Sequence, residues 1–112
     1  MIDLEAGAAM AAYQRYIEDL EAMHGWTDVD LVHNCFLLGE EVGELFKAVR
    51  RHKKLFEQGE AEAQSQDAAK AAVAEELVDV FNYLLALANR LDIDLESAFR
   101  AKNARNQSRT WT

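Results

Sequence analysis

The amino-acid sequence predicts an all-α fold, a four-helix bundle-like domain completed by oligomerisation. The chain of 112 residues contains no proline and only five glycines, and it is rich in Ala, Glu and Leu. Few residues therefore interrupt a helix, and many favour one. Apolar residues recur at three- and four-residue spacings, the period of an amphipathic helix. A chain of this length buries one core more readily than two, which predicts a single domain over residues 1–112.

The first predicted helix can be capped by Asp3, and we expect it to end around His24 and Gly25, because glycine suits a helix C-cap. Its apolar positions are Met10, Tyr13, Ile17 and Leu20. Alanines at positions 8, 9, 11 and 12 permit a second helix to approach closely, within one chain or between two. At least a homodimer is therefore expected.

The second predicted helix can begin at Thr27 or Asp28, and one of its faces is apolar over several turns. That face carries Leu31, Cys35, Leu38, Val42, Leu45 and Val49. The position of Cys35 on it predicts a buried, inert thiol. The basic run RRHKK at residues 50–54 is interpreted as a solvated helix end and is left out of the site.

A polar connection is expected over residues 58–66, which lack an apolar stripe. The third helix then begins at about Asp67, and its apolar positions are Val73, Leu77, Val80, Leu84, Leu87 and Leu91. Asp94 can cap a fourth, shorter helix that runs through Leu95 and Phe99. The four helices form a bundle with short to medium connections.

Composition excludes several classes of protein. The formal net charge of -8 disfavours a nucleic-acid polymer or an anionic membrane as the partner, since both are bound by basic faces. The single cysteine excludes an intramolecular disulfide. The N-terminus does not resemble a signal peptide, and no stretch is apolar enough to span a bilayer. A cytoplasmic protein is expected.

An acidic phrase occurs twice, as GEEVGELF at residues 39–46 and AEELVDVF at residues 74–81. Helical spacing places Glu41 and Glu44 on one flank of the second helix, and Glu76 and Asp79 on the matching flank of the third. If the two helices pack antiparallel, the four carboxylates converge and repel one another unless a cation lies among them. The repeat therefore indicates a metal site.

Carboxylate oxygens alone suit a hard divalent cation, above all Mg²⁺, with Mn²⁺ as a substitute. Mg²⁺ commonly recruits phosphate oxygens of a substrate, so a phosphate-bearing ligand is implied. The spacing leaves an alternative open, namely an acidic solvated face that pairs with nearby Lys and Arg. A di-iron carboxylate bundle is disfavoured, because neither phrase has a histidine at the required offset.

The sequence resembles the all-α nucleoside triphosphate pyrophosphohydrolases, the MazG-like group, over about residues 24 to 109. The resemblance is carried by HGW, LVHNCFLLGEEVGEL, EELVDVFNYL and KNARNQSR, in this order along the chain. The two acidic phrases resemble the EExxE and ExxD signature of the family. By this resemblance the Mg²⁺ ligands are Glu41, Glu44, Glu76 and Asp79. Glu40 matches the first acid of the signature, whereas Glu75 is an additional acid.

The predicted C-terminal helix carries Lys102, Asn106 and Arg109 on one stripe, a combination suited to phosphate oxygens. The resemblance implies phosphate contacts for Lys102 and Asn106, with Arg109 as a third candidate. The alternative is that the basic residues only complement the helix C-terminus. Trp26 is the candidate for stacking on a nucleobase.

The resemblance implies hydrolysis of a (deoxy)nucleoside triphosphate between the α and β phosphates, which yields the monophosphate and pyrophosphate. Glu40 or Glu44 is the candidate general base, and the sequence does not choose between them. Two alternatives stay open. One is a related phosphoanhydride hydrolase of the phosphoribosyl-ATP or dUTP type, and the other is a non-catalytic helical interaction module.

Overall fold

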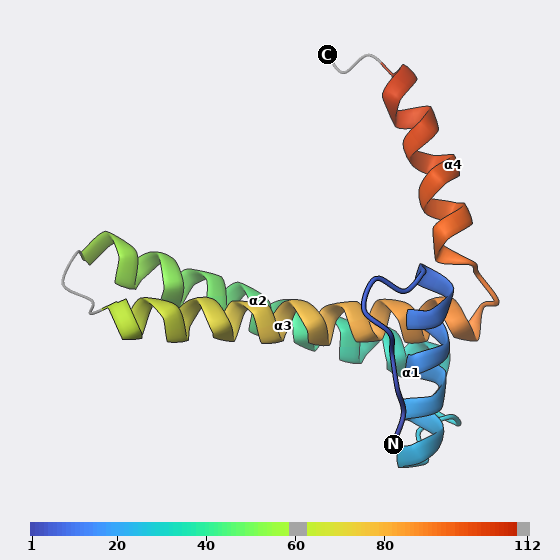
Figure 1. Cartoon of the computed structure of the whole chain (residues 1–112). Coiled ribbons are helices and arrows are strands. Elements are labelled where there is room, and N and C mark those ends of the chain that lie inside the picture. Colours follow the sequence, from blue (N-terminus) through green and yellow to red (C-terminus); the bar gives the residue numbers. More distant parts are fainter. Residues whose placement is uncertain (59–62, 110–112) are drawn as a thin grey trace. The chain divides into compact units, whose positions relative to one another are not determined.

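A computed structural model describes residues 1–58 and 63–109 of the chain (Figure 1). These residues form four α-helices and no strand: α1 (Met10–His24), α2 (Leu31–Gln58), α3 (Ala63–Arg90) and α4 (Leu95–Ser108). The predicted all-α, bundle-like fold is confirmed. Among the described helices, none combines the length and the apolarity that a bilayer span requires.

The chain divides into two compact units. The terminal unit comprises Met1–Val29 and Leu85–Thr112, and the hairpin unit comprises Asp30–Leu84. The continuous helix α3 supplies residues to both units.

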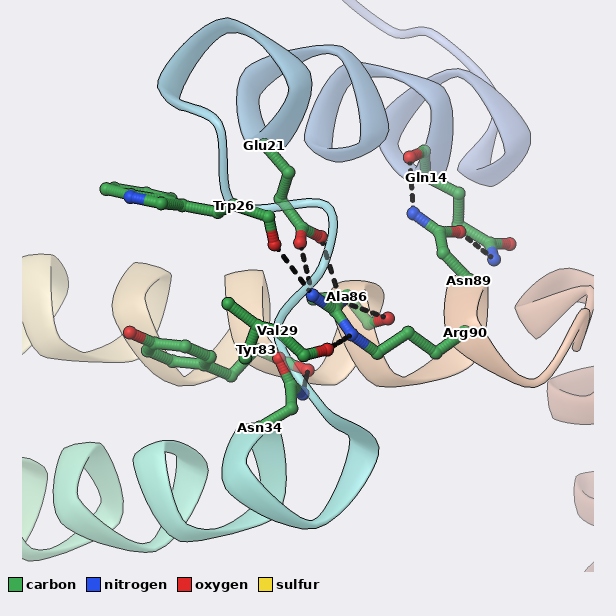
Figure 2. Close-up of polar contacts among 9 residues, drawn as sticks. All are labelled: Gln14, Glu21, Trp26, Val29, Asn34, Tyr83, Ala86, Asn89 and Arg90. Atoms are coloured by element: carbon green, nitrogen blue, oxygen red, sulfur yellow. Dashed lines mark hydrogen bonds and ion pairs between the residues drawn. The ribbon is translucent and has the colours of Figure 1, made fainter.

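In the hairpin unit, α2 and the first part of α3 run antiparallel and side by side (Figure 1). Helix α2 begins at Leu31, not at Thr27 or Asp28, because Asp30 supplies the N-terminal acceptor. Its Oδ2 accepts hydrogen bonds from the backbone N–H groups of Val32 at 3.0 Å and His33 at 3.4 Å. Asn34, which is only 2% exposed, donates through Nδ2 to the backbone carbonyl of Tyr83 at 3.3 Å (Figure 2). This bond ties α2 to α3 at a buried position.

The predicted polar connection over residues 58–66 is wrong at its C-terminal end. Helix α2 extends through Gln58, and α3 begins at Ala63 instead of near Asp67. Residues 59–62 lie outside the described part of the chain. Ala and Gln are good helix formers, so a helix can extend here without an apolar stripe to pack.

The apolar face expected on α2 and α3 is only partly covered. Leu38, Val42 and Leu45 are half-buried, whereas Leu77 and Leu84 are exposed. Cys35 is exposed as well, so the expectation of a buried thiol is wrong for the single chain. Two helices alone leave part of each apolar stripe without a partner.

In the terminal unit, the predicted N-terminal cap of α1 is wrong and the predicted C-terminal end is correct. The Asp3 side chain accepts from the neighbouring Leu4 N–H, and the helix begins only at Met10. At the other end, Gly25 has φ 73°, and its N–H donates to Ala22 O at 3.3 Å. The left-handed backbone conformation there explains why glycine ends the helix.

The core of the terminal unit is formed by Ile17 of α1 and by the last turns of α3. The buried α3 side chains are Leu85, Ala86 and Ala88. Asp94 is the N-cap residue of α4, as predicted, but its carboxylate accepts from the Ser97 hydroxyl instead of a backbone N–H. The first N–H of α4 therefore needs another acceptor.

Candidate metal centre

Three residues of the repeated acidic phrases converge in the hairpin unit. Glu41 of α2 and Glu76 and Asp79 of α3 each offer a carboxylate oxygen, and these oxygens lie within 4.8 Å of one another. Glu76 and Asp79 share a face of α3 because they are three residues apart, and the antiparallel neighbour α2 supplies Glu41. The matched spacings in the sequence thus become one cluster.

The electrostatics of this cluster favour a positive charge within it. Burial raises the pKa of Glu41 above the ordinary value of 4.5, and the negative charge of Asp79 raises it further. A side-chain hydrogen bond with Glu76 and the charges of Glu76 and Glu44 act in the same direction. Either a proton or a cation relieves this repulsion.

The donors present fit a divalent metal ion. Oxygen Oε2 of Glu76 is buried and has no hydrogen-bond partner, an arrangement that is costly unless something coordinates it. Together with Glu41 and Asp79 it forms an oxygen-only donor set, which is the preference of hard cations. These three residues could hold a metal ion.

The other acidic candidates, Glu44 and Glu40, lie outside the group of three. Glu44 is exposed, and one of its oxygens lies 3.8 Å from Lys47 Nζ. Its charge still contributes to the raised pKa of Glu41, so it lies near the cluster. Glu40 is exposed, as is the additional acid Glu75.

The phosphate-binding candidates lie at the end of α4 in the terminal unit. Lys102 is exposed, while Asn106 is half-buried and donates through Nδ2 to Asn103 Oδ1 at 3.1 Å. The Asn106 Oδ1 is buried without a hydrogen-bond partner. Helix α4 ends at Ser108, and Arg109 has an extended backbone, so the expectation that it continues the helical stripe is wrong. Of the three candidates, Lys102 and Asn106 share that stripe.

Trp26 lies in the connection after α1 and is 52% exposed. Its ring stacks on His24, with ring centroids 4.5 Å apart and an interplanar angle of 26°. Its backbone carbonyl accepts from Arg90 Nη2 at 3.2 Å (Figure 2). The structure thus presents an exposed aromatic ring on a tethered segment.

Sequence reasoning missed the polar residues that organise the terminal unit. These are Gln14, Glu21, Asn89 and Arg90, which join α1 to the end of α3 (Figure 2). Arg90 also donates from Nε to Val29 O at 2.9 Å. Their partners lie more than 60 residues apart in sequence, and local spacing contains no signal for such pairs.

Comparison with known proteins shows the family of the chain. Residues 33–111 match the MazG nucleotide pyrophosphohydrolase domain. The chain is also 26% identical over 92 residues to the uncharacterized protein YvdC of Bacillus subtilis (strain 168), an alignment that covers 82% of this chain and 87% of that protein. The matched segment contains both acidic phrases and all of α4. The chain belongs to the MazG nucleotide pyrophosphohydrolase family.

Proposed function

We propose that this protein is a Mg²⁺-dependent pyrophosphohydrolase that cleaves a (deoxy)nucleoside triphosphate between the α and β phosphates. The observation that carries the proposal is the convergence of Glu41, Glu76 and Asp79, with the unpartnered Glu76 oxygen among them. Membership of the MazG family supports this reaction class. The whole chain, residues 1–112, is proposed to act as one domain, since α3 contributes to both units.

The proposed ligands are Glu41, Glu76 and Asp79, with Glu44 as a fourth. Carboxylates without nitrogen or sulfur donors favour Mg²⁺, and Mn²⁺ can substitute for it. When bound, the ion supplies charge for the phosphate oxygens and lowers the pKa of a coordinated water. The carboxylates orient that ion, and their mutual repulsion favours its binding.

Glu40 or Glu44 is proposed to accept the proton of the attacking water. Both side chains are exposed and adjoin the proposed ligand Glu41 on α2. A general base has to be reachable from the water and ionised at the working pH. The pH–rate profiles of variants at the two positions distinguish them. The substitution that abolishes the fall in rate at low pH identifies the residue that acts as the general base.

Lys102 and Asn106 are proposed to contact the phosphates, with Arg109 as a third contact, and Trp26 to stack on the base. Lys102 supplies a cation and Asn106 an amide on one stripe of α4. The exposed Trp26 ring offers a flat apolar surface of the kind on which bases stack.

A homodimer or homotetramer is proposed as the working assembly. The hairpin unit exposes several large apolar side chains, of which Phe36 is 70% exposed and Phe46 is 68% exposed. Gly39 and Gly43 lie between them on α2, and a Cβ added to either would meet no atom within 4 Å. Glycines in a helix are costly, roughly 0.5–1 kcal/mol each relative to alanine, and close approach of a second copy would explain them.

The net charge of -8 argues against nucleic-acid polymers and anionic membranes as partners.

The test is product analysis. The purified protein is incubated with Mg²⁺ and a panel of standard and modified nucleoside triphosphates that also contains dUTP and phosphoribosyl-ATP. Release of monophosphate and pyrophosphate supports the proposal, and the preferred substrate separates it from the two related hydrolases. Release of diphosphate and phosphate contradicts the cleavage position. No metal-dependent cleavage of any compound would favour the non-catalytic interaction module.

A further inference from the structure

The corner between α3 and α4 is a tight turn. Helix α3 ends at Arg90 and α4 begins at Leu95. Between them Asp92 adopts a left-handed conformation with φ 53°, which is uncommon outside glycine. The N–H of Ile93 returns to the carbonyl of Ala88 at 2.9 Å. The corner determines the direction in which α4 leaves α3.

Helix α4 has few other anchors in the terminal unit. None of its residues is buried, so no buried apolar face fixes its orientation within the chain. Among the described elements its neighbour is α1. The orientation of α4 therefore depends on the contacts that α1 makes with the corner. The positions of Lys102 and Asn106 depend on that orientation.

The side chain of Gln14 in α1 forms hydrogen bonds with three parts of this corner. Its Nε2 donates to Asn89 Oδ1 at 3.1 Å and to the backbone carbonyl of Ile93 at 2.8 Å. Its Oε1 accepts the N–H of Leu95, the first residue of α4, at 3.0 Å. Asn89 returns a bond from Nδ2 to the backbone carbonyl of Gln14 at 2.8 Å (Figure 2). One side chain thus contacts the last turn of α3, the turn itself and the start of α4.

Gln14 also supplies the acceptor for the N-terminus of α4 that the Asp94 side chain does not provide. A helix begins with N–H groups that have no acceptor within the helix, and a side chain at the N-cap usually satisfies one of them. Asp94 bonds to Ser97, so the Leu95 N–H takes Gln14 Oε1 from another helix instead. Only an amide at position 14 can both donate to two oxygens and accept this N–H.

We propose that Gln14 and Asn89 are positioning residues, which fix the direction of α4 and thereby hold Lys102 and Asn106 where they contact the triphosphate. This inference rests on the proposed function, since it assumes that α4 binds phosphate. The two amides affect substrate binding through the orientation of α4, without touching the substrate.

The first arm of the test measures steady-state kinetics with Mg²⁺ and the triphosphate that the wild type cleaves best. The variants are Gln14→Ala and Gln14→Glu, where the second keeps an acceptor for Leu95 but loses both donations. Glu18→Ala is the matched control, because Glu18 is exposed on the same helix one turn further on. We expect KM to rise about tenfold in both Gln14 variants, with kcat changed much less, as loss of these hydrogen bonds loosens α4. A KM within twofold of the wild type in a folded Gln14 variant would overturn the proposal.

The second arm reads the orientation of α4 without substrate. Spin labels are attached to cysteines placed at Glu18 in α1 and Gln107 in α4, in a Cys35→Ser background, and the distance distribution is measured by pulsed electron resonance. A narrow distribution that broadens with Gln14→Ala is expected, and an unchanged distribution would overturn the proposal. If the wild type cleaves no nucleotide, the proposed function fails, while the distance distribution still decides whether the amides fix α4.

Discussion

Arg90 and Glu21 form a two-point ion pair within the terminal unit. Nη1 donates to Oε1 at 3.1 Å and Nη2 donates to Oε2 at 2.6 Å, and the two side chains are only 15% and 12% exposed. The same guanidinium donates to the backbone carbonyls of Trp26, Val29 and Ala86. Arginine suits this position because its donors form a rigid, planar fork. The pair joins α1, the connection after it and α3.

Glu21→Gln is expected to destabilise the protein by about 3 kcal/mol, because it leaves the Arg90 charge in a largely buried place without its counter-charge. The measurement is urea unfolding followed by circular dichroism. Glu18→Gln is the control, since Glu18 is exposed on the same helix. Equal stability of the Glu21 variant and the control would show that the pair contributes nothing.

Glu41→Gln is expected to stabilise the metal-free protein, raising Tm by about 3 °C, because it removes one of the charges that repel within the cluster. Adding Mg²⁺ is expected to raise the Tm of the wild type and to leave that of the variant nearly unchanged. Scanning calorimetry with EDTA or with Mg²⁺ measures both effects. An equal response of the two proteins to Mg²⁺ would remove Glu41 from the site.

The raised pKa of Glu41 predicts how stability depends on pH. The folded state holds this proton more tightly than the unfolded state, so the associated stability is fully present below the ordinary pKa of 4.5. It is lost as pH rises through the raised pKa of the folded state. The free energy of unfolding of the metal-free wild type, relative to Glu41→Gln, is therefore expected to fall over this window. Urea unfolding at a series of pH values measures the difference, and an increase with pH would contradict the sign.

Substitution of the exposed phenylalanines tests the assembly. The wild type is expected to be a dimer or tetramer at micromolar concentration, and Phe36→Asp or Phe46→Asp is expected to shift it towards monomer, because the charge has to be buried in an apolar interface. Light scattering measures the mass. Leu91→Asp, an exposed apolar position in the terminal unit, is the control. A monomeric wild type would refute the proposed assembly.

The sequence predicted the fold class because the apolar period persists over long helices, and it predicted the grouping of Glu41, Glu76 and Asp79 because three-residue spacings share a helix face. Helix ends were less predictable. Asp3 does not cap α1, and Arg109 leaves the stripe of α4, since end positions depend on single hydrogen bonds.

The bonds between Gln14 and Asn89 could not be predicted at all. The two residues are 75 positions apart, and nothing in either local pattern distinguishes them from solvent-exposed amides. The exposure of Cys35 was missed because its position on the apolar face predicts burial. A periodic pattern indicates which face is buried, but it does not indicate whether the same chain or a second one covers that face.

Metal binding to the three converging carboxylates is the central claim, and titration with Mn²⁺ tests it most directly. Free Mn²⁺ is measured by its electron resonance signal in the presence of the wild type, Glu76→Gln and the matched control Glu75→Gln, whose side chain is exposed next to the cluster on α3. We expect the wild type and the control to bind Mn²⁺ with equal affinity and Glu76→Gln to bind at least tenfold more weakly. Equal affinity of all three proteins, or no binding by any, would contradict the account.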